Sequence, residues 1–401
     1  VRAERMKPVH SDIRGPLFVE AMKRQKQGID ILKLNTGNPA TFGFGLPDSI
    51  KNALMEHMQD GVGYCDFKGM PQARQAICDY ETSKGIKGIT PDDVFIGNGV
   101  SEVVSFALTP LLNDGDEVLV PSPSYSLWGN SVYLEDGKPV FYTCDEQANW
   151  YPDIQDIRSK ITDKTKAIVI INPNNPTGVL YPKEILLEII QVAREFGLLI
   201  FADEIYDRLV MDGKQHISLA SLTEDVPVIT LNGLSKSHCL CGYRCGWMVI
   251  SGPRELTEDY RQGIIQLTSL RLCANTMAQI VIPAALDDME TPASMVRPGG
   301  RIYEQREATV RELEKIDGLS FVKNDAAFYV FPKLDVKKFN ITNDKQFAHD
   351  LLDATNILLV PGSGFDWKDP DHFRIVMLPQ ADILSDAIRR MGTFLDGYKQ
   401  K

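Results

Sequence analysis

Three cysteines, a lysine and an arginine lie within the stretch "NGLSKSHCLCGYRCGW", which runs from Asn232 to Trp247. Cys239, Cys241 and Cys245 are spaced as Cys-x-Cys-x3-Cys, whereas structural zinc sites use Cys-x2–4-Cys pairs with a second pair elsewhere. No cysteine stands out as paired with a histidine and an asparagine for nucleophilic catalysis. We therefore expect no metal site, and interpret the thiols as small, weakly apolar side chains that pack a tight turn.

Lys236 has neighbours that suggest a different chemistry. It follows the apolar run "VITLNGLS", so we expect it at the carboxyl end of a strand, where open α/β sheets bind ligands. Ser235 precedes it, and Arg244 follows between Gly242 and Gly246. A serine, a lysine and an arginine on one turn can bind a phosphate while the amine stays available for covalent chemistry. This combination favours a site for pyridoxal 5'-phosphate (PLP), with Lys236 as the amine that bonds to the cofactor.

A PLP site needs further groups, and the chain offers a candidate for each. The pyridine nitrogen needs a carboxylate, and "FADEIY" supplies Asp203 at a strand end with Tyr206 three residues later. The phosphate needs backbone N–H groups at a helix start, which "FIGNGVSEVVSFAL" provides at Ser101. Tyr125 in "PSPSYSLW" offers a flat face for the ring, and Asn175 in "INPNNPTG" offers an amide for its phenolic oxygen.

The glycines before Ser101 also allow a competing interpretation. Gly97-Asn98-Gly99 begins like the dinucleotide-binding fingerprint G-x-G-x-x-G. Glu102 occupies the place of the third glycine, so this interpretation is weak. Taken singly, Asp203 is more typical of a polar strand end and Lys236 of a solvated surface residue, while the segment around Asn175 is typical of a plain loop. It is their combination that predicts a site.

Composition and charge narrow the class of protein. The chain has 401 residues, of which 43% are hydrophobic and 24% are charged, and its formal net charge is −11. An acidic surface argues against nucleic-acid binding. No apolar run is long enough to span a bilayer, and no signal peptide is recognisable. We therefore expect a cytoplasmic protein, whose seven scattered cysteines are reduced thiols.

The order of apolar runs predicts the fold. Continuous Val/Ile/Leu runs, typical of a sheet covered on both faces, predict strands at 116–123, 166–174, 198–206, 227–235 and 246–252. A helix is predicted at 182–197, with Pro182 near its start and Gly197 at its end. We therefore predict an α/β fold in which residues 46–285 form a large, doubly wound, mostly parallel sheet domain.

The pattern changes after Pro283. A charged helix at 300–316 precedes "LSFVKNDAAFYVFPKL", which predicts a hairpin at 319–334, and then "HFRIVML" and a C-terminal helix. These elements predict a smaller α+β domain over residues 286–401. The N-terminal segment, residues 1–45, is expected to be part of it.

At this point the chain closely resembles the class I aminotransferases, which are PLP enzymes of fold type I. The motifs "NPNNPTG", "FADEIYD", "LSKSHCLCGYRCGW" and "FRIVMLP" match that family in order and spacing over nearly the whole length. "KLNTGNP", "GYCDFKG", "IGNGVSE", "RLCAN" and "PGGRIYEQR" are similar to the bacterial alanine (glutamate–pyruvate) aminotransferases. Relatives often carry other residue types at the three cysteine positions, which suggests that the thiols are replaceable filling.

The resemblance implies roles for residues at matching positions. Lys236 and Asp203 would be the catalytic residues, one as cofactor-bearing amine and proton shuttle and the other as partner of the pyridine nitrogen. Tyr64 would reach the phosphate from the partner subunit of a homodimer. The implied cofactor-binding residues are Val100, Ser101, Tyr125, Asn175, Asp203, Tyr206, Ser235, Lys236, Arg244 and Tyr64, and the implied substrate-binding residues are Gly37, Asn175 and Arg374.

The expected reaction is amino transfer between L-alanine and 2-oxoglutarate, which gives pyruvate and L-glutamate by a ping-pong mechanism. Arg374 would bind the α-carboxylate bidentately. Glutamate's distal carboxylate needs another cation, for which Arg14 in "SDIRG" and Arg271 in "SLRLCAN" remain open. Alternatives on the same fold are an aspartate or broad-specificity aminotransferase, a C–S lyase and a decarboxylase. A ligand-sensing regulator would need a DNA-binding module and a basic patch, neither of which the sequence suggests.

Overall fold

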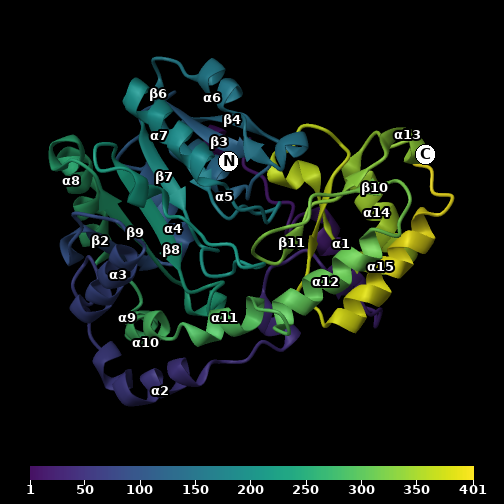
Figure 1. Ribbon diagram of the computed structural model, residues 1–401, viewed down its shortest axis with the longest axis horizontal. Helices are drawn as coiled ribbons and strands as arrows, with labels where there is room; N and C mark the ends of the chain where they lie inside the picture. The colour runs from purple at the N-terminus through teal and green to yellow at the C-terminus, as the bar shows by residue number, and fades with distance from the viewer.

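An eight-stranded sheet forms the centre of the computed structural model, which describes residues 1–401 (Figure 1). Its five middle strands run parallel to one another, while the strands at β9 and β5 are antiparallel to their neighbours. The five predicted strands are all present in it, and the prediction of a mostly parallel sheet is confirmed. In spatial order the strands are β2 (Val94–Asn98), β9 (Cys245–Ser251), β8 (Val228–Gly233), β7 (Leu199–Asp203), β6 (Thr165–Ile171), β3 (Glu117–Ser122), β4 (Lys138–Asp145) and β5 (Tyr151–Pro152).

Helices cover both faces of this sheet, as the continuous apolar strands require. Alternate residues of one strand enter two different cores, because successive side chains of a strand point to opposite faces. In β6, for example, Ile168 and Ile170 pack with α7 (Lys183–Phe196). Val169 and Ile171 pack in the other core with side chains of three helices, α4 (Val100–Leu108), α5 (Leu127–Leu134) and α8 (Arg254–Arg271). α7 begins after Pro182 and ends at Gly197, which adopts the left-handed conformation with φ of 66°.

The strand directions gather several loops at one edge of the sheet. β3, β6, β7 and β8 are parallel, so their carboxyl ends lie together. β2 is antiparallel to β9, which is antiparallel to β8, and so β2 also ends at this edge, where α4 begins. Ligands bind in the crevice outside these strand ends in open α/β sheets. The predicted site residues between 97 and 236 follow these strand ends.

A second group of elements lies beside the large sheet and contains the C-terminus (Figure 1). Its apolar core consists of Leu34 and buried residues between 313 and 395. Within it α12 packs against α15, and β1 pairs in parallel with β13, so the segment around 32–34 belongs to this group. The elements are α1 (Pro16–Lys26), β1 (Leu32–Lys33), α12 (Arg301–Leu313), β11 (Tyr329–Val330), α14 (Asp344–Thr355), β13 (Ile357–Leu358), β14 (Val360–Pro361), β15 (Phe373–Val376) and α15 (Ala381–Leu395).

The hairpin predicted at 319–334 is only partly correct. β10 (Leu319–Ser320) and β12 (Lys333–Leu334) do pair antiparallel, but β11 between them pairs with β15 instead. The reason is a long-range contact that sequence periodicity cannot reveal. The backbone N–H groups of Asp325 and Ala326 donate to the carbonyl oxygen of Gly178, which draws this stretch onto the large sheet's edge.

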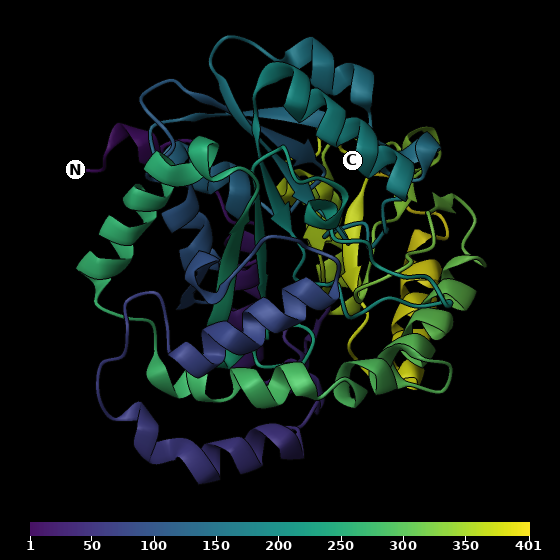
Figure 2. The same ribbon diagram turned by 60° about the vertical axis from the view of Figure 1, so that its left-hand side comes forward.

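Three further helices, α2, α9 and α10, lie at the outer rim of the molecule. α2 (Asp48–His57) lies at the outer edge of the molecule in Figure 2, packed on α9 (Thr276–Ile280) and α10 (Ile282–Asp287). Taken singly, no helix has the length and apolarity to cross a membrane. The bent pair Arg254–Arg271 and Thr276–Asp287 meets those criteria only when its two parts are taken together.

Candidate active site

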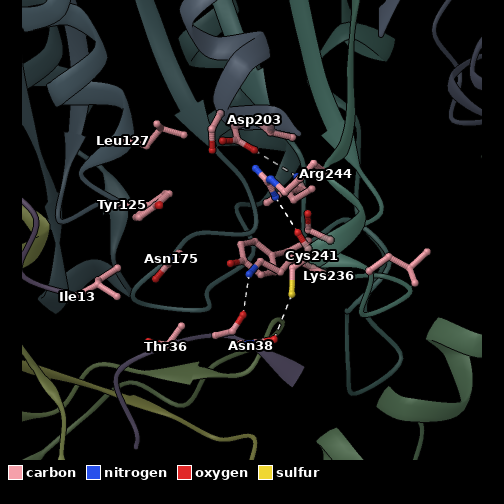
Figure 3. A pocket seen from close by; sticks show the side chains of 18 of the residues that line it. Ile13, Thr36, Asn38, Tyr125, Leu127, Asn175, Asp203, Lys236, Cys241 and Arg244 are labelled. Carbon is pink, nitrogen blue, oxygen red and sulfur yellow. Dashed lines mark hydrogen bonds between the residues drawn. The ribbon is translucent and has the colours of Figure 1, made fainter. Parts of the chain in front are cut away.

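A cavity of about 1060 Å³ lies at the carboxyl edge of the large sheet. Figure 3 shows Asp203, Lys236 and Arg244 facing a common space, with Tyr125 and Asn175 across it. The structure thus brings together all but one of the cofactor-binding and substrate-binding residues implied by the sequence. The lining includes Gly37, Val100, Ser101, Tyr125, Asn175, Asp203, Tyr206, Ser235, Lys236, Arg244 and Arg374.

Tyr64 is the exception. Its side chain is 83% exposed, and it is not among the residues that line the cavity. It follows the short helix Met58–Gly61, which contacts α9 through a hydrogen bond from Thr276 Oγ1 to the carbonyl oxygen of Gly61. Within one chain Tyr64 therefore has no part in the cavity.

Lys236 projects into the cavity from the turn that follows β8. Its Nζ donates to the carbonyl oxygen of Gly37 at 2.9 Å and lies 5.8 Å from the centre of the Phe328 ring. Position 37 admits no side chain, because a Cβ there would stand 2.3 Å from Oη of Tyr329. The glycine therefore lets the backbone approach both the lysine and the tyrosine.

Asp203 is a buried carboxylate without a cationic partner. Its Oδ2 accepts a hydrogen bond from Nε1 of Trp128 at 3.0 Å, and its Oδ1 accepts one from the backbone of Ile205 at 3.3 Å. Burial raises the pKa of Asp203 to about 6, although the hydrogen bond from Trp128 acts in the opposite direction. A positively charged ligand group in the cavity would restore the usual preference for the ionised form.

Arg374 is the complementary case, a buried guanidinium without a carboxylate. Its Nη1 donates to Oδ1 of Asn175 at 2.9 Å and its Nη2 donates to the carbonyl oxygen of Asn35. The guanidinium lies 4.6 Å from the Tyr329 ring and 4.7 Å from the Phe365 ring. Burial lowers the pKa of Arg374, yet an arginine stays protonated in proteins. Its Nε has no acceptor, so donors remain for a planar anion.

A comparison with another buried arginine shows that the lack of a carboxylate partner at Arg374 is unusual. Arg306 is also fully buried, but both of its terminal nitrogens lie 2.7 Å from the carboxylate of Asp212. Buried charges in proteins are generally paired, because an isolated one is costly. The unpaired carboxylate of Asp203 and the unpaired guanidinium of Arg374 in the same cavity therefore indicate a ligand that carries both a cationic and an anionic group.

A third part of the cavity is suited to a phosphate. Gly99 precedes α4 with φ of 81°, and the helix start directs the N–H groups of Val100 and Ser101 toward the cavity end where Arg244 lies. A Cβ at Gly99 would stand 2.3 Å from Nη2 of Arg244, so only glycine lets the guanidinium lie against the helix start. Ser235 adds a hydroxyl. Helix N–H groups, hydroxyls and an arginine together form a ready site for a dianion.

Two residues of the site had not been singled out from the sequence. Trp128 holds Asp203 from α5, and Tyr329 shares a hydrogen bond of 2.9 Å with Tyr206 between their hydroxyl groups. Burial raises the pKa of Tyr206. Trp128 stands three residues after Tyr125 in "PSPSYSLW", but that spacing does not indicate that its indole contacts Asp203. Tyr329 lies in the misassigned hairpin and gives no sequence signal.

The structure separates the two arginines left open for a distal carboxylate. Arg14 lines the cavity with an exposed side chain. Arg271 does not line it, because its Nη1 donates to Glu102 and its guanidinium lies 5.3 Å from the Phe106 ring. Glu102 also accepts from the backbone of Asn98 at 2.7 Å, which ties down the loop that had suggested a dinucleotide fingerprint.

The cysteines of the 232–247 stretch lie in two different places. Cys245 is buried within β9, whereas Cys239 and Cys241 line the cavity. Cys241 Sγ donates to Oδ1 of Asn38 at 3.3 Å. Burial raises the pKa of Cys239 and that of Cys245 to about 12. No group of three or more His, Cys, Asp or Glu side chains in the chain has the geometry to hold a metal ion.

Comparison with known proteins decides the family. A family model described as aminotransferase class I and II matches residues 29–388. The chain belongs to this family. This aminotransferase is 50% identical over 399 residues to the glutamate-pyruvate aminotransferase AlaA of Haemophilus influenzae, with 100% of this chain and 99% of that protein covered.

Solved structures agree with this assignment. An aminotransferase from Escherichia coli superposes with a TM-score of 0.98 at 46% identity, covering 100% of this chain and 99% of the other. The alanine aminotransferase of Pyrococcus furiosus superposes with a TM-score of 0.94 at 40% identity, covering 99% and 100%. The predictions of an aminotransferase and of the fold-type-I architecture are thereby confirmed.

Proposed function

We propose that this aminotransferase uses PLP to move an amino group between L-alanine and 2-oxoglutarate, giving pyruvate and L-glutamate. The observation that carries the proposal is the pair of unpaired buried charges, Asp203 and Arg374, in the cavity that contains Lys236. The relatives of closely similar length support the substrates, since they are named glutamate-pyruvate aminotransferase and alanine aminotransferase.

PLP fits the groups that line the cavity. Its phosphate matches the start of α4 with Ser235 and Arg244, and its protonated pyridine nitrogen matches the unpaired carboxylate of Asp203. Tyr206 and Asn175 would contact its phenolic oxygen, and Tyr125 would offer a flat face for its ring. The cavity is at the upper end of the range of roughly 300–1,000 Å³ typical of ligand sites, which leaves room for an amino acid beside the cofactor.

Bound PLP would supply an electron sink for the bonding electrons of the substrate's α-carbon. The protein's own residues would hold the cofactor, orient the substrate and transfer the proton. Asp203 keeps the pyridine nitrogen protonated, which is a charge-assisted contact stronger in the transition state than in the ground state. Lys236 Nζ would be the general acid–base that takes up the α-proton of the substrate and gives it up again. In the structure this amine donates to the carbonyl oxygen of Gly37.

Arg374 fixes the orientation of the substrate. Two of its N–H donors are used by Asn175 and Asn35, and the remaining ones can bind the α-carboxylate in parallel. The Tyr329 and Phe365 rings beside it limit its motion. The α-carbon is thereby held with its proton within reach of Lys236, a positioning effect that can supply much of a rate enhancement.

Arg14 is our candidate for the distal carboxylate of glutamate. The segment that carries it is held in place by His10, whose Nε2 lies 2.9 Å from Asp366 and whose Nδ1 lies 3.2 Å from Asp12. The hydrogen bonds to these two carboxylates raise the pKa of His10 to about 9. Arg14 lines the cavity with an exposed side chain and would bind the distal carboxylate, a group that alanine lacks.

A homodimer is part of the proposal. Supporting it is a set of exposed apolar side chains on α2, on the loop that follows it and at the end of α8. Leu270 and Tyr64 are each 83% exposed, Val62 is 76% exposed and Met55 is 69% exposed. Large exposed apolar residues gathered on neighbouring elements are typical of protein–protein interfaces. Dimerisation would allow Tyr64 to reach the phosphate in the partner's cavity.

The test is a matrix of amino donors and 2-oxo acid acceptors with the purified PLP-loaded protein. Alanine with 2-oxoglutarate, and glutamate with pyruvate, should give the highest kcat/KM, with parallel double-reciprocal lines for the ping-pong scheme. Lys236→Ala, which lacks the amine proposed to bind the cofactor, is the negative control. A wide preference for aspartate or an aromatic donor would refute the alanine assignment and leave the aminotransferase family unaffected.

A further inference from the structure

Lys84 lies behind the active site, at the end of α3 (Pro71–Ser83), and contacts three carboxylates at once. Its Nζ is 2.7 Å from Glu81, 2.8 Å from Glu204 and 3.2 Å from Asp207. The lysine side chain is 12% exposed, and the three acids are 0%, 2% and 2% exposed. A lysine buried to this degree is rare unless paired, and here it is shared among acids from two distant segments.

Two of these acids alternate along the chain with two residues of the active site. Asp203 and Tyr206 line the cavity, whereas Glu204 and Asp207 do not line it and bind Lys84 instead. Residues 204–208 follow β7 as a turn without strand pairing. Its one backbone hydrogen bond to the sheet runs from the N–H of Glu204 to the carbonyl oxygen of Leu231 in β8. Side-chain contacts on its rear face add to this bond, and Lys84 binds both carboxylates of the turn.

The same cluster reaches the strand that leads to Lys236. Asp207 Oδ2 accepts hydrogen bonds from Tyr80 Oη at 2.6 Å and from Asn232 Nδ2 at 2.9 Å. Asn232 belongs to β8, four residues before Lys236. Glu204 Oε1 in turn accepts from Ser218 Oγ at 3.0 Å. Lys84 is thus the cation that contacts the carboxylates of a polar cluster, which joins the segments of Asp203, Tyr206 and Lys236. Arg208 on the same turn lies 4.5 Å from the Tyr80 ring and donates to backbone carbonyl oxygens instead.

The charge balance makes this lysine hard to replace. Three buried carboxylates surround one ammonium, and burial raises the pKa of Glu81 to about 7. Trp247 Nε1 donates to Glu81 at 3.2 Å. Removing the partner of a buried charge is strongly destabilising, because the remaining charge is left uncompensated. Without Lys84, Glu204 and Asp207 would repel each other and turn toward other donors.

We propose that Lys84 is a positioning residue of the active site: through Glu204 and Asp207 it holds the 203–208 turn so that Asp203 and Tyr206 face the cofactor. The part that concerns the cofactor rests on the function proposed above. The part that concerns the turn does not, because amide exchange of the turn can be measured in any folded form of the protein.

The experiment compares Lys84→Met with two matched variants. Lys87→Met removes a lysine three residues further on, whose side chain is 71% exposed and pairs only with Glu224 at 2.8 Å. Lys84→Met combined with Glu81→Gln keeps the formal charge of the four groups at −2, because it leaves two carboxylates and no ammonium instead of three carboxylates and one ammonium. The double variant therefore shows whether a defect comes from the lost contacts between Lys84 and the turn or only from the change in net charge. Lys84→Arg keeps a cation near the acids.

For Lys84→Met we expect kcat to fall on the order of 10- to 100-fold, since a misplacement of about 1 Å can cost about 100-fold. KM for alanine should change less than about threefold, because Arg374 binds its carboxylate from another segment. The Kd of PLP should rise about tenfold or more, and the amides of Asp207 and Leu209 should exchange faster by a similar factor. The double variant should keep these defects, Lys84→Arg should recover most of the loss, and Lys87→Met should stay within about twofold.

The proposal is overturned if Lys84→Met, folded by circular dichroism, keeps wild-type PLP affinity, kcat and turn exchange. It is also overturned if the charge-matched double variant returns to wild-type values, because Lys84 would then only balance charge. If Lys84→Met does not fold, the same three measurements are made on the double variant and on Asp207→Ala, and wild-type values in these variants overturn the proposal. If the wild type lacks alanine transamination, the function proposed above fails, while the exchange and PLP-binding measurements still decide the role of Lys84.

Discussion

Replacement of Arg374 by lysine should impair recognition of the substrate carboxylate while leaving the cavity intact. Lysine keeps the charge but cannot make two parallel hydrogen bonds or lie flat between the Tyr329 and Phe365 rings. The loss of one charge-assisted hydrogen bond costs about 1.5–3 kcal/mol, and the loss of cation–π contact costs about 0.5–1 kcal/mol. The sum of about 2–4 kcal/mol corresponds to a fall in kcat/KM for alanine of about 30- to 900-fold.

The assay is steady-state kinetics with alanine and 2-oxoglutarate, with the Kd of PLP measured alongside. Arg306→Lys is the matched control, because Arg306 is equally buried, lies 5.0 Å from the Tyr303 ring and pairs with Asp212 outside the cavity. We expect Arg306→Lys to lower the melting temperature and spare kcat/KM, and Arg374→Lys to spare PLP binding. A loss below about fivefold in Arg374→Lys, well under the energy of one charge-assisted hydrogen bond, would refute the reasoning, as would an equal loss in Arg306→Lys.

Three further outcomes are expected. Asp203→Ala should raise the activation free energy by about 3–4 kcal/mol, the typical contribution of one buried electrostatic partner of the transition state, and so lower kcat. A near-wild-type rate in steady-state assays would remove Asp203 from the mechanism. Arg14→Gln should raise KM for glutamate and 2-oxoglutarate about five- to tenfold and spare alanine and pyruvate, since an exposed charged contact is worth only about 1 kcal/mol. Arg271→Gln should not discriminate between the two kinds of substrate, and equal losses for all four substrates in Arg14→Gln would contradict its role. Inactive Lys236→Ala subunits mixed with weakly active Tyr64→Phe subunits should regain activity above the sum of the two, because a mixed dimer has one site free of both changes; a fully active monomer by light scattering would contradict shared sites.

The large sheet could be predicted from the sequence because its signal is local. β6 and β8 are runs of buried apolar residues, and α7 lies between a proline and a glycine that mark its ends. The predicted strands at 166–174 and 198–206 extended too far, because the polar residues after Ile171 and Asp203 form the loops of the site. The position of Lys236, Asp203 and Asn175 followed from the rule that parallel strands end at one edge.

The remaining features depend on contacts between distant segments. Trp128 and Tyr329 are aromatic residues in buried positions, which are typical of any core. Lys84 follows a helix, where a lysine is normally solvated, and only the fold shows that Glu204 and Asp207 surround it. Likewise, Arg14 and Arg271 could not be distinguished until the structure placed one at the cavity and the other beside Glu102.

The central claim is tested most directly by a single turnover with ¹⁵N-labelled alanine and no acceptor. The account predicts one pyruvate per active site and then no further product, with the label retained on the protein. Addition of 2-oxoglutarate should then release the label as glutamate, and Lys236→Ala should do neither. Continued release of pyruvate together with free labelled ammonium, in the absence of any acceptor, would contradict amino transfer and indicate an elimination reaction instead.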